Sequence, residues 1–215
     1  PSYARRTKSG GTAPRFRLVN KVLNPHLCKF YYFIHHHYHF NRMQDLPNLR
    51  QEYSKSTLEV ETIMKDPVKQ FEKWFQEAVQ SGVVEPNAMT VSTVKADGRP
   101  SSRILLLKGI ENQKFVFFTN YQSSKGKELE QNPAVALNFF WPELERQVRI
   151  EGVAQRIDAA RSEAYFQSRP RGSQIGAWSS PQSAVLDNRK ILEERIHEIE
   201  RRFEGKTVLP KPQQW

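Results

Sequence analysis

Apolar residues recur at helical spacing from about residue 70, directly after a polar pair that suits the start of a helix. Asp66-Pro67 places an N-cap residue before a proline at the first helical position. The apolar positions that follow share one side of a helical projection: Phe71, Trp74, Phe75, Ala78 and Val79. This spacing predicts a helix that ends near Gly82 and packs one face on a core.

Five short runs rich in β-branched or aromatic residues come next, and they predict strands. The runs cover residues 89–94, 103–107, 114–119, 134–140 and 147–153. The turn signal Ala96-Asp97-Gly98-Arg99 separates the first two runs and indicates a hairpin. Closely spaced strands with short turns favour an antiparallel sheet or barrel over a doubly wound parallel sheet.

Helical patterns return after residue 120. Ser123 caps a short predicted helix that stops at Asn132-Pro133, and Asp158 opens another that stops before Pro170. A longer helix begins near Asp187, with Gly205 expected just beyond its end, at the C′ position. Its apolar positions are Leu192, Ile196, Ile199 and Phe203. The predicted fold class is α+β, a mainly antiparallel barrel with flanking helices.

The formal charge of +10 is concentrated near the N-terminus. Residues 1–42 hold eight Lys or Arg and no acid, so residues 43–215 carry only +10 − 8 = +2. The small net charge of residues 43–215 argues against a surface that binds nucleic acid. The alternative is a basic nucleic-acid-binding protein that uses residues 1–42, and its binding would depend steeply on salt.

Residues 1–42 show few signs of a fold. They contain the only cysteine, Cys28, and five of the six histidines, but no ligand pattern elsewhere completes a metal site. The apolar patch at 30–34 is too short to span a bilayer, so no membrane partner is expected. We expect Met43 to be the natural start, with residues 1–42 as an upstream, disordered or non-native extension and 43–215 as the domain.

A single cysteine excludes a disulfide framework and fits a reducing compartment, so the expected location is the cytoplasm. The Arg-rich, acid-free residues 1–42 leave open a transit peptide and therefore an organelle.

A first group of residues, on a predicted strand and at the start of a predicted helix, suggests an anion site. Arg103 and Lys108 stand at the ends of an apolar run that is predicted to be a buried strand, and buried charges need partners. Ser123-Ser124-Lys125-Gly126-Lys127 opens a helix, where free amides and the helix dipole favour a phosphate. Because side chains alternate along a strand, the two cations are expected on opposite faces unless the strand bulges or ends between them.

A second group, Tyr165, Arg169 and Ser173, is spaced by four residues around Pro170. Gln147 lies in a predicted strand, where a buried amide can both donate to and accept from a heterocycle. Each feature also has a plainer interpretation: a helix cap with a solvated face, a packed tyrosine beside a solvated arginine, or an exposed strand glutamine.

Together, these segments resemble the pyridoxine (pyridoxamine) phosphate oxidase family. The resemblance runs from about Leu49 to Trp215 in a fixed order of motifs. They are Arg50-Gln51-Glu52-Tyr53, the Asp66-Pro67 helix, Arg103 to Lys108, Phe118-Thr119, Arg146-Gln147-Val148, Tyr165 to Gly176 and Gln182-Ser183. It implies a split β-barrel that works as a homodimer with FMN at the subunit interface.

The resemblance also implies where the ligands bind. It assigns FMN to Arg103, Ile104, Leu105, Leu106, Leu107, Lys108, Phe118, Thr119, Ser124, Lys125, Gln147, Gln182 and Ser183. It assigns the substrate phosphate to Lys108, Tyr165, Arg169 and Ser173, with Arg50, Gln51, Glu52 and Tyr53 as a lid. Two anion groups predicted from the residues thus match the two phosphates that the family binds.

The implied reaction transfers a hydride from pyridoxine 5'-phosphate or pyridoxamine 5'-phosphate to FMN, forming pyridoxal 5'-phosphate, and dioxygen then reoxidises the flavin. It needs no metal. The alternative is a non-catalytic flavin or pyridoxal-phosphate binding protein on the same fold.

The chain departs from the family in two places. Ser124 stands where family members usually have arginine, so one charged contact to the FMN phosphate is missing. The family continues past the position of Trp215, through a Gly-Gly strand, to a segment with catalytic Arg and His residues. The resemblance therefore leaves the catalytic residues unassigned among residues 1–215 and implies a low oxidase rate for these residues alone.

Overall fold

The computed structural model describes residues 48–49, 52–55 and 57–215. Residues 52–215 form one compact unit. The predicted boundary at residue 42 and the histidine-rich segment lie outside the described residues, so both stay predictions.

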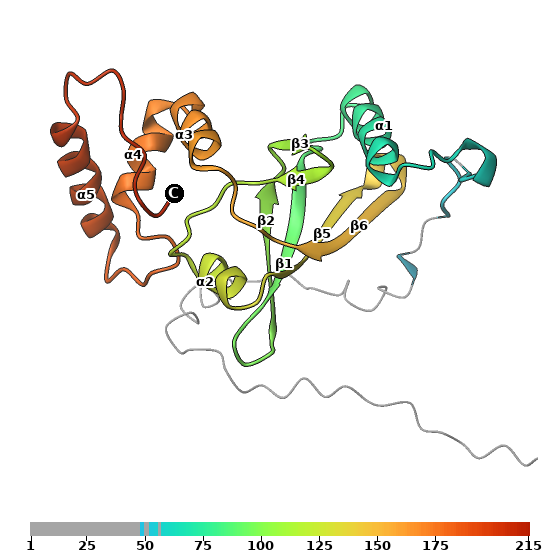
Figure 1. The fold of residues 1–215 in the computed structure, drawn as a ribbon, viewed down its shortest axis with the longest axis horizontal. Coiled ribbons are helices and arrows are strands. Elements are labelled where there is room, and N and C mark those ends of the chain that lie inside the picture. The colour runs from blue at the N-terminus through green and yellow to red at the C-terminus, as the bar shows by residue number, and fades with distance from the viewer. Residues whose placement is uncertain (1–47, 50–51, 56) are drawn as a thin grey trace, which may run out of the picture. The chain divides into compact units, whose positions relative to one another are not determined.

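Four strands form one antiparallel sheet in the order β2-β1-β5-β6, and two short strands pair separately (Figure 1). The large sheet contains β1 (Ala88–Val94), β2 (Pro100–Leu106), β5 (Ala134–Trp141) and β6 (Arg146–Val153). The small antiparallel sheet contains β3 (Gly109–Glu111) and β4 (Lys114–Val116). All five predicted strands are present, and β3 is the one that the pattern did not predict.

The predicted hairpin joins β1 and β2. Gly98 adopts a positive φ of 79°, and the Asp97 side chain accepts hydrogen bonds from the backbone N–H and side chain of Arg99. Every second residue of β1 is buried, so one face of this interior strand builds the core.

The strand around Arg103 is not buried as predicted. It forms β2, which pairs with β1 on one side only, and Ile104 is 63% exposed. Because side chains alternate along an edge strand, only part of the apolar run reaches the core. Leu107, just past the end of the strand, is the member that is fully buried.

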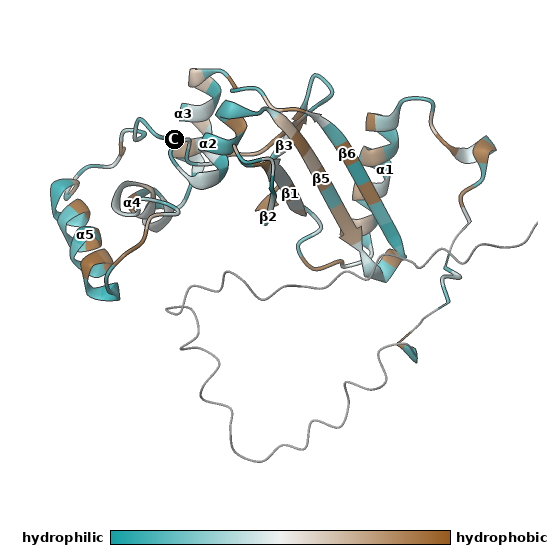
Figure 2. Cartoon of the chain, turned by 90° about the horizontal axis from the view of Figure 1, so that it is seen from below, coloured by the Kyte–Doolittle hydropathy of each residue, from teal (hydrophilic) through white to brown (hydrophobic). Residues whose placement is uncertain are grey.

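Helix α1 (Pro67–Gln80) begins where predicted, since the Asp66 carboxylate accepts hydrogen bonds from Val68 N and Lys69 N. Its Phe71 ring lies 4.9 Å from Phe139 and 5.0 Å from Phe115. These rings fill the core between α1 and the sheets. Figure 2 shows β5 as mainly hydrophobic and β6 as mainly hydrophilic, which fits an interior strand beside an edge strand.

Helices α3 (Ala159–Ser168), α4 (Arg171–Ser179) and α5 (Arg189–Arg202) share a second core. Its buried members are Phe166, Ile175, Ile199, Phe203 and Leu209. Helix α4 was not predicted, because Pro170 suggested only a stop; the proline instead precedes a new helix at its N-cap. Gly205 lies two residues beyond the α5 C-cap, Phe203, and not at C′ as expected.

In the part of the chain that the structure describes, no helix is long and apolar enough to cross a membrane. Nor do His, Cys, Asp or Glu side chains of these residues group in threes as a metal site would require.

Candidate functional site

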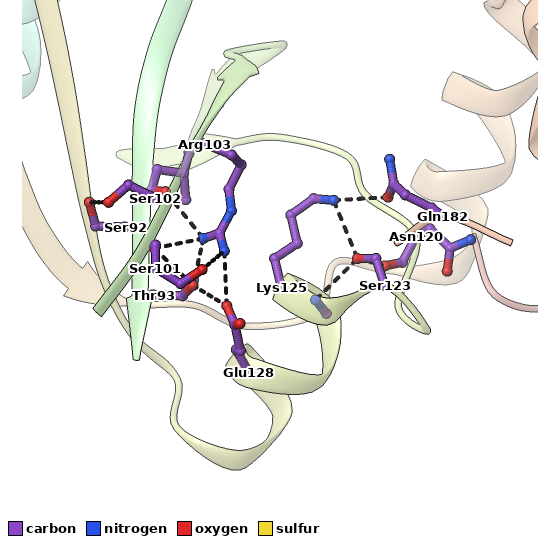
Figure 3. Close-up of polar contacts among 12 residues, drawn as sticks. Ser92, Thr93, Ser101, Ser102, Arg103, Asn120, Ser123, Lys125, Glu128 and Gln182 are labelled. Atoms are coloured by element: carbon purple, nitrogen blue, oxygen red, sulfur yellow. Dashed lines mark hydrogen bonds and ion pairs between the residues drawn. The ribbon is translucent and has the colours of Figure 1, made fainter. Parts of the chain in front are cut away.

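The structure brings two of the predicted phosphate-binding cations into one polar cluster (Figure 3). Arg103 extends from β2, and Lys125 lies in the first turn of α2 (Ser124–Gln131). The helix starts here because Ser123 Oγ accepts a hydrogen bond from Gly126 N and donates one to Asn120 O. Glu128 follows Lys125 by three residues on the same helix and faces Arg103.

The Arg103 guanidinium is held from two sides. Its Nη1 donates to Val91 O, Thr93 Oγ1 and Ser101 O, and its Nη2 donates to Ser101 Oγ at 2.6 Å. Nη2 also forms an ion pair of 2.9 Å with Glu128 Oε2. Arg103 is therefore anchored to the β1–β2 hairpin and to α2.

Glu128 is a buried carboxylate, only 8% exposed. Burial raises the pKa of this carboxyl, but hydrogen bonds from Thr93 and Arg103 outweigh it, and the pKa lies below its ordinary value. Glu128 is therefore ionised at neutral pH and balances one of the two cations.

Lys125 is 7% exposed and has neutral partners. Its ammonium donates to Gln182 Oε1 at 2.8 Å and to Ser123 Oγ at 3.3 Å, and it turns away from Arg103 (Figure 3). Burial, and then the charge of Arg103, lower the pKa of this ammonium. A buried cation held by neutral oxygens is a site that an anion would stabilise.

A second cluster gathers aromatic rings around Arg169. Phe118 stacks on Tyr165 with ring centroids 3.6 Å apart, and Tyr165 stacks on Trp215 at 6.1 Å. The Arg169 guanidinium lies 4.1 Å from the centre of the Trp215 ring. Burial lowers the pKa of Arg169, because its charged form loses contact with water.

Two buried polar side-chain atoms have no hydrogen-bond partner within the described part of the chain, namely Thr119 Oγ1 and Arg169 Nη1. Both residues were predicted from the sequence to contact a ligand. Thr119 lines a cavity of about 1270 Å³ together with Phe118 and Trp215. Unpaired polar atoms of this kind call for an explanation, and a bound ligand supplies one.

A separate hollow of about 770 Å³ is lined by Ser124, Gln182 and Ser183, with further side chains from α4 and α5. Ser183 has a positive φ of 69°. These three predicted FMN residues therefore lie beside the Lys125 cluster, which Gln182 joins directly.

Other predicted residues lie apart from both clusters. Lys108 is exposed beyond the end of β2, and its backbone N–H donates to Val116 O. Gln147 is exposed on β6 and donates to Asn138 across the strand pair. Ser173 is half-buried in the first turn of α4, where its N–H donates to Pro170 O.

In the predicted lid, Glu52 and Tyr53 are exposed, and Arg50 and Gln51 lie outside the described residues. The next residues are anchored, since Ser54 N and Lys55 N both donate to one oxygen of Glu145.

Sequence reasoning missed Thr93, Glu128 and Trp215 as members of the clusters. An acid three residues after Lys125 shares a helix face with it, and this was the one available signal for Glu128. The contacts of Thr93 and Trp215 come from distant segments, which the pattern does not reveal.

Comparisons with known proteins agree with the predicted family. A family model described as "Pyridoxamine 5'-phosphate oxidase" matches residues 75–203. The chain is 52% identical over 172 residues to the pyridoxine/pyridoxamine 5'-phosphate oxidase of Rubrobacter xylanophilus, covering 80% of this chain and 79% of that protein. It is 53% identical over 170 residues to the protein of that name from Leptospira interrogans, covering 79% of each.

A solved structure shares the fold. PhzG from Burkholderia lata 383, in complex with tetrahydrophenazine-1-carboxylic acid, superposes with a TM-score of 0.69 at 25% identity. The match covers 75% of this chain and 80% of PhzG. The predicted α+β split barrel is thus confirmed, and the chain belongs to the pyridoxamine 5'-phosphate oxidase family.

Proposed function

We propose that this protein oxidises pyridoxine 5'-phosphate or pyridoxamine 5'-phosphate to pyridoxal 5'-phosphate, with FMN as cofactor and dioxygen as the electron acceptor. The observation that carries the proposal is a pair of separate cations, the buried Lys125 and the half-buried Arg169, neither of which forms an ion pair with a carboxylate in the described part of the chain. The reaction needs two phosphate sites, one for the cofactor and one for the substrate.

The residues around Lys125 fit the phosphate of FMN. Its ammonium supplies charge, and Ser124 and the first turn of α2 supply polar donors. When bound, FMN accepts the hydride and passes the electrons to dioxygen. The role of the protein is to hold and orient the cofactor.

The residues around Arg169 fit the phosphate of the substrate. Its free Nη1 can donate to a phosphate oxygen, while Trp215 holds the plane of the guanidinium. The stacked rings of Phe118 and Tyr165 exclude water beside it. This arrangement binds and orients the substrate without needing an acid–base pair at this point.

We also propose a homodimer with FMN at the subunit interface. Ile104 on β2 and Phe140 on β5 are exposed on the same face of the large sheet, and Gln147 pairs with Phe140 there. Two exposed apolar side chains on one face, next to an edge strand, suit contact with a second copy of the chain. Gln147, far from the Lys125 cluster in its own subunit, would then serve the site of the partner.

The proposed reaction is tested by mixing the FMN-loaded protein with pyridoxine 5'-phosphate without oxygen. We expect the flavin absorbance to bleach, and to return with release of peroxide when oxygen is admitted. Unphosphorylated pyridoxine at the same concentration should bleach the flavin about 10 to 100 times more slowly, since it lacks the charge-assisted contact. Binding of both ligands without bleaching would favour the non-catalytic alternative.

The lowered pKa of Lys125 predicts a pH dependence of FMN binding. A bound phosphate raises this pKa again, so binding takes up protons, and the affinity falls as the pH rises through the pKa of Lys125 in the flavin-free protein. Riboflavin, which lacks the phosphate, corrects for titration of the flavin ring. We expect the ratio of FMN to riboflavin affinity to fall with rising pH in alkaline solution, and the fall should begin below the ordinary lysine pKa. A constant ratio would show that the Lys125 charge is not used.

A further inference from the structure

Arg103 has little hydrogen-bonding capacity left for a ligand. A guanidinium has five N–H groups, four of them on its terminal nitrogens. In this structure Nη1 and Nη2 meet five acceptors, which come from Val91, Thr93, Ser101 and Glu128. A phosphate that is to bind the terminal nitrogens must displace at least one of them.

Glu128 is the charged member of this set of acceptors. Its carboxylate is buried, lies 2.9 Å from Arg103 Nη2 and also accepts a hydrogen bond from Thr93. Two cations, Arg103 and Lys125, and one carboxylate leave the cluster with a net charge of +1. A phosphate carries close to two negative charges at neutral pH, so the carboxylate both occupies the donor and repels the ligand.

We propose that Glu128 competes with the phosphate of FMN for Arg103 and thereby sets the affinity of the cofactor site. The inference rests on the proposed FMN site. Lys125, which has neutral partners, then provides most of the positive charge that holds the phosphate. Arg103 contributes to phosphate binding only to the extent that its ion pair with Glu128 is broken.

The substitution Glu128→Gln removes the negative charge of the side chain and keeps nearly the same size and shape. The amide oxygen of glutamine can still accept from Thr93 and Arg103, while the net charge of the cluster rises from +1 to +2. We expect the Kd of FMN to fall about fivefold or more, because charge-assisted contacts to the phosphate become stronger. The Kd of riboflavin should stay within about twofold, because riboflavin has no phosphate to attract.

The matched control is Glu130→Gln on the same helix. Glu130 is exposed and pairs with Arg156, so its removal changes the net charge of the protein equally but at a screened position. Both flavins are titrated by fluorescence quenching in all three proteins. An FMN affinity that is unchanged or weaker in Glu128→Gln would overturn the inference, since Glu128 would then be neutral or supportive.

A crystal structure of the unaltered protein with FMN tests the same point if the glutamine variant does not fold. The inference predicts that Arg103 Nη2 contacts the phosphate and lies farther from Glu128 Oε2 than the present 2.9 Å. An intact ion pair with the phosphate on Lys125 alone would overturn it. Failure of every variant to bind either flavin would overturn the proposed function itself, and the inference with it.

Discussion

Gly126→Ala is expected to destabilise the protein by about 2 to 3 kcal/mol and to abolish binding of FMN, although alanine normally stabilises a helix. A Cβ at Gly126 would lie 2.3 Å from Tyr121 O, 2.6 Å from Tyr121 C and 2.7 Å from Asn120 O. All three atoms belong to the backbone, so no flexible side chain can move aside. Relief of the overlap must shift the start of α2, and Lys125 and Glu128 shift with it.

Urea unfolding and FMN titration measure the two effects of this substitution. The control is Gly172→Ala in α4, where an added Cβ meets nothing within 4 Å. That variant should be neutral or more stable by up to about 1 kcal/mol. Equal stability of the two variants would mean that the backbone at residues 120–121 can shift at little cost in free energy. Gly126 would then not be required for the site.

Arg169→Met is expected to weaken binding of pyridoxal 5'-phosphate about 10- to 100-fold, and to leave the affinity for unphosphorylated pyridoxal nearly unchanged. The reason is that Arg169 Nη1 is a buried donor in the second cluster and has no hydrogen-bond partner among the residues that the structure describes. Methionine keeps an apolar contact with Trp215 but provides neither charge nor donor. Because an unpaired buried donor is costly, the variant should be as stable as the parent or more so.

Calorimetric titration and a thermal melt check this prediction. Arg189→Met serves as control, since the Arg189 side chain is 89% exposed and forms an ion pair with Glu193 on its own helix. Loss of stability in Arg169→Met, without loss of affinity for the phosphate, would show that Arg169 holds the fold and not the ligand.

The elements that could be predicted from the sequence depend on residues that lie close together along the chain. An Asp cap, a proline at the first position and apolar residues at helical spacing suffice for α1, and Gly98 in a tight turn suffices for the β1–β2 hairpin. Helix α4 could not be predicted, because Pro170 was interpreted only as the end of α3 and also lies at the N-cap of α4. Strand β3 is three residues long, too short for a periodic pattern.

Burial and charge balance proved harder to predict. The run around Arg103 is as apolar as a buried strand, and only the strand order places it at an edge. Arg103 could be predicted as a cation on a strand and Lys125 as a cation at a helix start, but the ion pair of Arg103 with Glu128 depends on tertiary packing that brings α2 to the β1–β2 hairpin. The same holds for Trp215, which reaches Arg169 through tertiary packing.

The most direct test of two separate phosphate sites is a crossed titration of Lys125→Met and Arg169→Met with FMN and pyridoxal 5'-phosphate. FMN is titrated first, and pyridoxal 5'-phosphate is then titrated with FMN held well above its Kd for each variant. We predict that Lys125→Met weakens FMN about 10-fold or more and leaves pyridoxal 5'-phosphate nearly unaffected, with the reverse pattern for Arg169→Met. Equal losses of both ligands in both variants would contradict the account.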